Sequence, residues 1–142
     1  PMIEEIFTDL APLVEKRGIT LEADGDGVMT GSDALIYRLI FNLTENAVKY
    51  NRPGGSVRVC VTQETEKLLI RVSDTGCGIP EEYQQSIFQP FFRVDKSRSR
   101  EYGGAGLGLS LVWEIADLHG GSVWVEESSE KGTTIAVGLP VQ

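Results

Sequence analysis

The feature that most constrains the fold is the switch of the apolar residues between two periods along the chain. Two pairs of alternating apolar runs are each joined by a turn of hairpin length. The pairs are 56–62 with 67–74, and 122–128 with 133–140. Apolar stripes at helical spacing precede both pairs, over 33–50 and over 107–121. Helices that interleave with hairpins predict an α/β (α+β) fold, a two-layer α/β sandwich in which helices cover one face of a mixed, mostly antiparallel sheet.

The remaining segments predict shorter elements. Apolar residues at helical spacing predict a helix over 3–17, which Pro12 should kink or restart and Gly18 should cap. Residues 19–24 alternate like a strand, and 81–88 predict a short helix. The stretch from 89 to 107 has no periodicity, and loops of that length in a compact domain are usually functional or disordered.

Composition excludes several classes of protein. The 142 residues suit one domain, and a net charge of −8 argues against nucleic-acid binding. Two cysteines and one histidine do not predict a disulfide framework or a zinc site, so a cytosolic setting is the simplest interpretation. No apolar run approaches the roughly 18–20 residues of a membrane span, and no secretory leader opens the chain, which looks like a piece of something longer.

The helix predicted over 33–50 carries an unusual polar stripe. Asn42 and Asn46 are four residues apart and share one face, with Lys49 and Tyr50 close to it. Asparagine is a poor residue inside a helix, because its side chain competes for backbone hydrogen bonds. Amide oxygens suit Mg²⁺, a lysine suits phosphate and a tyrosine can stack on a base. The stripe is either a metal-nucleotide site or a solvated polar face.

A second polar group follows the strand at 67–74. Asp74 ends this strand, and Gly76 and Gly78 follow it. A buried carboxylate can accept a hydrogen bond from the exocyclic amine of adenine, and glycines let the backbone approach a flat ring. The alternative is a tight turn with a capping aspartate.

A glycine-rich segment, "GGAGLGLS" at 103–110, opens the second long helix. Backbone N–H groups at such a junction favour anions. A P-loop would need lysine where the chain has Leu109, and a dinucleotide fingerprint would need a preceding strand. Four basic residues between Arg93 and Glu101 add local positive charge, which suits a polyphosphate or simply marks a solvated loop.

Four blocks together resemble a known family. The blocks are "NLTENAVKY" (42–50), "DTGCGIP" (74–80), "FQPFFRVDKSRS" (88–99) and "GGAGLGLSLV" (103–112). They are similar, in order and spacing, to the N, G1, F and G2 boxes of the catalytic ATP-binding domain of sensor histidine kinases, in the superfamily shared with gyrase and MutL. The resemblance implies a Bergerat-type fold. It makes 19–142 the catalytic domain and 1–18 a linker or the end of a dimerisation helix region.

The resemblance also implies ATP and Mg²⁺ as cofactors and assigns roles to residues. Asn46 and Asn42 would hold the metal, and the catalytic group would be Asn42, Glu45, Asn46 and Lys49. Phe88 would help to anchor a lid over the nucleotide. The residues implied around the nucleotide are Asn42, Asn46, Lys49, Tyr50, Asp74, Gly76, Gly78, Ile79, Phe88, Arg93, Gly104, Gly106, Leu107, Gly108, Leu109 and Thr133.

The implied activity is transfer of the ATP γ-phosphate to a histidine. ATP-hydrolysing relatives carry a glutamate base at the position of Asn42, and an amide cannot take a proton in that way. Glu45 is a possible base, but a helix turns it about 100° from Asn46. His119 ends a helix and is expected to be structural. The alternatives are a stand-alone gyrase-type ATP hydrolase and a nucleotide-binding regulatory module without chemistry.

The implied partners lie outside this sequence. The acceptor histidine would belong to a helical dimerisation domain of the same protein, and a response regulator would receive the phosphoryl group. The full protein is expected to be a dimeric, membrane-anchored sensor, with this domain in the cytoplasm.

Overall fold

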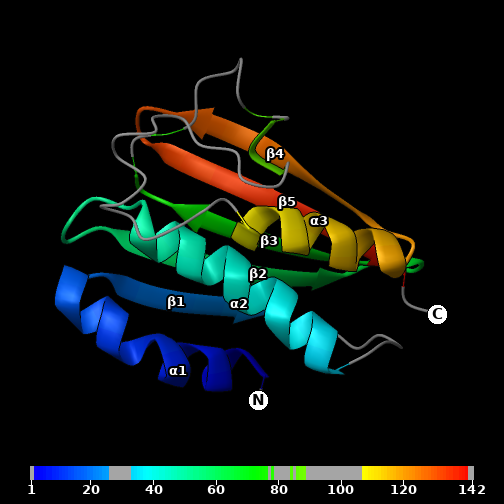
Figure 1. The fold of residues 1–142 in the computed structure, drawn as a ribbon, viewed down its shortest axis with the longest axis horizontal. Helices are drawn as coiled ribbons and strands as arrows, with labels where there is room; N and C mark the ends of the chain where they lie inside the picture. Colours follow the sequence, from blue (N-terminus) through cyan, green and yellow to red (C-terminus); the bar gives the residue numbers. More distant parts are fainter. Residues whose placement is uncertain are drawn as a thin grey trace.

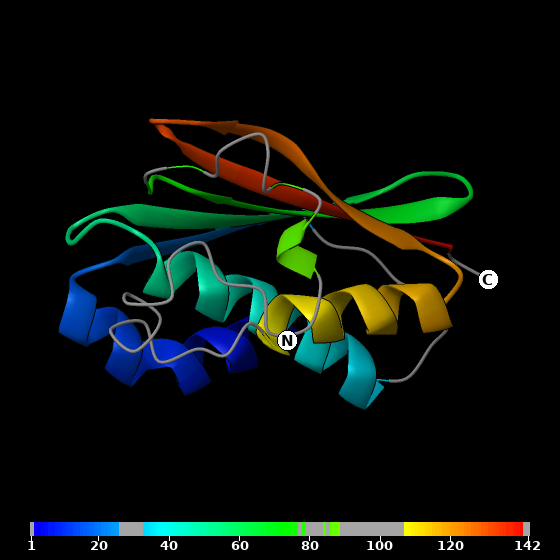
Figure 2. The ribbon, with the colours of Figure 1, turned by 45° about the horizontal axis from the view of Figure 1, so that its top comes forward.

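The fold has two layers, a sheet and the helices that cover one of its faces (Figures 1 and 2). The computed structural model describes residues 2–25, 33–76, 78, 84, 86–88 and 107–140. The strands are β1 (Thr20–Gly25), β2 (Ser56–Gln63), β3 (Lys67–Asp74), β4 (Ser122–Ser129) and β5 (Gly132–Pro140). The helices are α1 (Met2–Arg17), α2 (Asp33–Lys49) and α3 (Leu107–Leu118), with a 3-10 turn η2 (Ser86–Phe88). The predicted two-layer α/β sandwich is confirmed.

The sheet is mixed, in the strand order β1-β2-β3-β5-β4. The β1–β2 pair is parallel, and the other three pairs are antiparallel. This register pairs Asp74, the last residue of β3, with Val57 on one side and Thr133 on the other. The end of the central strand therefore lies between the start of β2 and the start of β5.

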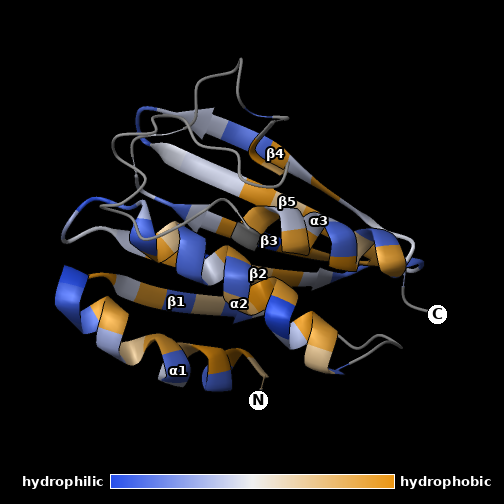
Figure 3. Ribbon diagram, in the orientation of Figure 1, coloured by the Kyte–Doolittle hydropathy of each residue, from blue (hydrophilic) through white to orange (hydrophobic). Residues whose placement is uncertain are grey.

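The core lies between the sheet and the helices. Along β2, Val57, Val59 and Val61 are buried against the helices, while the intervening residues belong to the open face. The apolar stripe of α2, visible in Figure 3, includes the fully buried Leu39 and Leu43. Each such side chain contributes about 1.5–3 kcal/mol relative to exposure. This burial fixes which face of α2 is turned away from the core.

Glycines end two of the helices as predicted. Gly18 has φ of 67°, its N–H bonds Glu15 O at 3.3 Å, and the N–H of Ile19 bonds Val14 O at 3.1 Å. This pair of bonds is a Schellman motif. The same pattern after α3 ends that helix at Leu118, earlier than the predicted 121. Pro12 lies inside α1, so the alternative of a restart at that proline is wrong.

Helix α1 contributes to the same core as the rest of the chain. Ile6 and Leu10 are buried members of the apolar cluster that includes α2 and the sheet. The boundary between 18 and 19 stays a prediction. Of the helix predicted at 81–88, the structure describes Gln84 and η2 alone. Among the described helices, none combines the length and the apolar character that crossing a bilayer requires.

Candidate functional site

The end of α2 and the end of β3 meet at one place, and Gly76 is the point of contact. A Cβ built on Gly76 would lie 2.8 Å from the carbonyl oxygen of Tyr50 and 3.4 Å from Cα of Asn51. Only a residue without a side chain permits so close an approach without a shift of the backbone. Two groups that the sequence predicted separately, around Asn46 and around Asp74, therefore belong to neighbouring segments.

One of the two carboxylate oxygens of Asp74 is hydrogen-bonded to the backbone. Its Oδ1 accepts hydrogen bonds from the N–H of Gly76 at 2.8 Å and from the N–H of Thr133 at 3.3 Å. Burial raises the pKa of Asp74 above its ordinary value of 3.8, and these two backbone bonds oppose that rise. Among the described residues, no donor bonds Oδ2. Asp74 therefore keeps one carboxylate oxygen available to a ligand.

The hairpin of β4 and β5 forms the neighbouring wall. Thr133 is buried, and its Oγ1 lies 2.9 Å from Oγ of Ser128. Gly78 has φ of 84°, and a Cβ there would lie 2.1 Å from the carbonyl oxygen of Ser129. The loop after β3 thus runs against this hairpin, and Thr133, one of the predicted nucleotide residues, lies beside Asp74.

The polar stripe of α2 divides into two parts. Asn42 is buried and Asn46 is half-buried on the same face, one turn apart. Lys49 forms an ion pair with Glu45 at 3.9 Å, and both side chains are about one-third exposed. A Glu four residues before a Lys on a helix favours such a pair, so the spacing alone could have predicted it. Glu45 thus lies beside Lys49, the predicted phosphate contact.

Sequence reasoning missed Asn51, which stands next to the predicted residues. Its side chain is 4% exposed, and Nδ2 donates to the carbonyl oxygen of Ser56 at 2.8 Å. Its Oδ1 accepts from the N–H of Arg52 at 2.8 Å and from Oγ1 of Thr75 at 3.1 Å. Asn51 therefore fastens the end of α2 to the starts of β2 and of the loop after β3. The available sequence signal was an asparagine directly after a predicted helix end, a position where asparagine often makes local hydrogen bonds.

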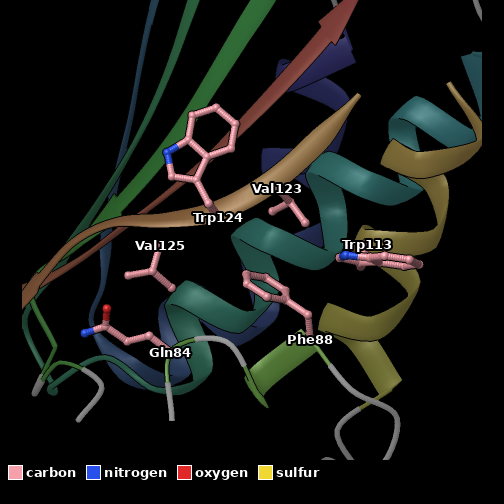
Figure 4. A pocket seen from close by; sticks show the side chains of 6 residues that line it. All are labelled: Gln84, Phe88, Trp113, Val123, Trp124 and Val125. Carbon is pink, nitrogen blue, oxygen red and sulfur yellow. The ribbon is translucent and has the colours of Figure 1, made fainter. Parts of the chain in front are cut away.

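Other predicted residues lie elsewhere or outside the described part of the chain. Phe88 and Leu109 pack against the apolar core, and Leu107 and Gly108 open α3. Phe88 also lines a cavity of about 400 Å³ between η2, α3 and β4 (Figure 4). The other lining residues are Gln84, Trp113, Val123, Trp124 and Val125, and Figure 4 shows the ring of Trp124 on the opposite side of β4 from Phe88.

This cavity is separate from the α2–β3 junction, because neither Asp74 nor Asn46 lines it. Its chemistry also differs, since its lining is mostly aromatic and aliphatic and includes no charged side chain. Asp74 and Asn46, the two polar groups that the sequence singled out, thus belong to the junction and not to this cavity. Ile79, Arg93, Gly104 and Gly106 lie outside the described residues.

Three comparisons with known proteins agree on one family. Residues 31–142 match the family described as histidine kinase-, DNA gyrase B-, and HSP90-like ATPase. The sensor histidine kinase WalK of Bacillus subtilis is 43% identical over 98% of this chain, which spans 22% of WalK. The sensor histidine kinase RppB of Synechocystis is 35% identical over 99% of the chain, which spans 32% of RppB.

Solved structures give the same result. The catalytic domain of the histidine kinase ThkA superposes with a TM-score of 0.84 at 27% identity, covering 99% of this chain and 90% of that domain. ThkA in complex with the response regulator TrrA superposes with a TM-score of 0.80 at 25% identity, over 99% of this chain and 40% of that chain. The chain belongs to the histidine kinase-, DNA gyrase B- and HSP90-like ATPase family, and within it to the catalytic ATP-binding domains of sensor histidine kinases.

Proposed function

We propose that the α2–β3 junction binds the adenine end of Mg·ATP and that Asp74 reads the adenine amino group. The carrying observation is the half-buried Asp74 carboxylate, whose Oδ1 accepts from two backbone N–H groups while no donor in the described part of the chain bonds Oδ2. A buried acceptor of this kind favours an exocyclic amine and disfavours the carbonyl oxygen that guanine carries instead. The close contact of Gly76 with the backbone of Tyr50 brings the Asp74 loop next to the exposed Tyr50, whose ring would stack on the base.

The residues fit a magnesium ion that the phosphates help to coordinate. Among the described residues, no group of three His, Cys, Asp or Glu side chains could hold a metal by itself. Mg²⁺ in nucleotide sites typically takes one or two protein oxygens, with phosphate and water oxygens completing its shell. Asn46 would supply such an oxygen, with Asn42 one turn away. When bound, the ion would neutralise charge on the phosphates.

Lys49 would contact the phosphates from the same helix. Its pair with Glu45 is partly exposed, and exposed ion pairs contribute only about 0–1 kcal/mol, so a phosphate can replace the carboxylate at little cost. Glu45 would then stand next to the reacting end of the site. Ile79, Arg93, Gly104, Gly106, Leu107, Gly108 and Leu109 remain predicted members of the nucleotide site.

The proposed reaction is phosphoryl transfer to a histidine of another domain. Asn42 occupies the position where ATP-hydrolysing relatives carry their glutamate base, so activation of water is not favoured. His119 is an unsuitable acceptor because of its position: the adjacent Gly120 lies near Pro140, and Pro140 pairs with Lys67 at the opposite end of β3 from Asp74. The acceptor would belong to a helical dimerisation domain of a cytoplasmically exposed, membrane-anchored sensor, and a response regulator would be the next carrier.

Labelled ATP distinguishes the possible activities. The chain is incubated with γ-labelled ATP and Mg²⁺, with and without a separately produced dimerisation domain from the same protein. We expect label on that domain and no label on this chain. Steady release of phosphate in the absence of the domain would instead support a hydrolase, and binding without either reaction would support a regulatory module.

A further inference from the structure

Arg17 stands at the end of α1, outside every motif that pointed to a nucleotide, yet its side chain contacts the end of α2. Its Nε donates to the carbonyl oxygen of Val48 at 3.0 Å, and its Nη2 donates to the carbonyl oxygen of Asn51. These carbonyls bracket Lys49 and Tyr50, the two residues of the helix end that the proposed site uses. The last carbonyls of a helix have no partner within it, and a cation there also interacts favourably with the helix dipole.

The main chain of Arg17 reinforces the same contact. Its carbonyl oxygen accepts from the N–H of Gly54 at 3.1 Å, so backbone and side chain both hold the segment that leaves α2. Within the described part of the chain, no carboxylate lies within ion-pair distance of Arg17. The guanidinium therefore uses its donors on the end of α2 rather than on an acidic partner. A planar fork suits two carbonyls better than an ammonium does.

The side chain of Asn51 connects the end of α2 to the loop that follows β3. Its Oδ1 accepts from Oγ1 of Thr75 at 3.1 Å, and Thr75 is the residue between Asp74 and Gly76. Thr75 Oγ1 in turn accepts from the N–H of Ser56 at 2.9 Å. A continuous set of hydrogen bonds thus connects Arg17 to the loop that begins with Asp74.

We propose that Arg17 is a positioning residue for the nucleotide: through Asn51 it holds the Lys49–Tyr50 end of α2 in register with the Asp74–Gly76 loop. This inference rests on the proposed adenine-nucleotide site, and it adds a residue from a helix that the motifs do not include. Arg17 does not touch the ligand. It fixes the spacing between the two segments that do.

The test compares Arg17→Met with two matched controls in the chain of 142 residues. Met keeps an apolar stem and removes every donor. Lys16→Met makes the same kind of change at the neighbouring, exposed residue. Ile6→Val removes one methylene from the buried part of α1, far from the contact of Arg17 with the end of α2. Three quantities are measured for each: the Kd of Mg·ATP by calorimetry, the Tm, and amide hydrogen exchange of residues 48–56 without nucleotide.

We expect Arg17→Met to raise the Kd about tenfold and to speed exchange at 48–56. Arg17→Lys, which can restore one of the two bonds, should give an intermediate Kd. Lys16→Met should change none of the three quantities, and Ile6→Val should lower the Tm without altering the Kd. If Arg17→Met does not fold, the Kd of Arg17→Lys decides the question.

Three results would overturn the proposed role of Arg17. The first is that Arg17→Met changes neither the Kd of Mg·ATP nor the amide exchange at 48–56. If Arg17→Met does not fold, an unchanged Kd in Arg17→Lys has the same meaning. Another is an equal rise in Kd in Ile6→Val at the same loss of Tm, because the effect would then be one of general stability. The third is an equal rise in Lys16→Met, which would reflect charge alone. A wild-type chain that fails to bind Mg·ATP would refute the proposed site itself, which keeps the two failures distinct.

Discussion

Replacing Asp74 with asparagine should reduce the preference of the site for adenine over guanine. In Asp74→Asn the amide oxygen can still accept the bonds from Gly76 and Thr133 that Oδ1 now accepts. The nitrogen then takes the place of Oδ2 and turns an acceptor into a donor. A donor facing the adenine amino group has no partner, whereas the same donor can bond the carbonyl oxygen of guanine.

The size of the effect follows from the bond that is lost. A hydrogen bond to a charged group contributes about 1.5–3 kcal/mol, which corresponds to roughly a 10- to 150-fold rise in the Kd of ATP. GTP binding should stay constant or improve, so the ATP-to-GTP preference should fall by at least that factor. Folding should persist, because both backbone bonds to the side chain are kept and a desolvated charge is removed.

Calorimetric titration with Mg·ATP and Mg·GTP provides the measurement. Asp117→Asn, the same substitution on the exposed face of α3, serves as the control and should leave both Kd values unchanged. If Asp74→Asn is folded and the ratio of its Kd values for Mg·ATP and Mg·GTP is unchanged, Asp74 does not distinguish adenine from guanine.

Three further predictions concern the same region. Asn46→Ala should abolish most of the difference between ATP affinities measured with Mg²⁺ and with EDTA, and a full Mg²⁺ effect in the variant would exclude Asn46 as the metal ligand. Asn51→Ala should lower the free energy of unfolding by about 2–4 kcal/mol in urea titrations, because the buried Asn51 side chain loses three hydrogen bonds, each worth about 0.5–1.5 kcal/mol; a loss under 1 kcal/mol would contradict this. The folded pKa of Asp74 is raised from 3.8, so the native protein binds this proton more tightly than the unfolded chain does. Wild type should therefore lose stability relative to Asp74→Asn as pH rises from below 3.8 through the raised pKa; a stability difference that is constant with pH would show that the pKa is unshifted.

The sequence predicted the layers of the fold because its signals are local. Alternation in β2 and the stripe of α2 report burial directly, and glycines after α1 and α3 report helix ends. The restart at Pro12 was wrong because packing on both sides of it holds α1 together. Ile6 and Leu10 are buried before the proline and Val14 packs on the core after it, which offsets a cost of roughly 3 kcal/mol.

In the candidate site, too, local signals could be predicted from the sequence and long-range contacts could not. Asn42, Asn46 and Asp74 stand out as polar residues placed where a helix or strand would not need them. The contact of Arg17 with Asn51 joins residues 34 positions apart, and no periodicity reports a pair of that kind. The pair of Glu45 with Lys49 is local and could have been predicted from its spacing.

An amide chemical-shift titration with Mg·ATP shows where the nucleotide binds. If it binds at the α2–β3 junction, the shifts concentrate at Asn46, Tyr50, Gly76 and Thr133 and saturate together with one Kd. Shifts concentrated instead around Trp113, Val123 and Trp124 would contradict this and place the nucleotide in the cavity beside η2.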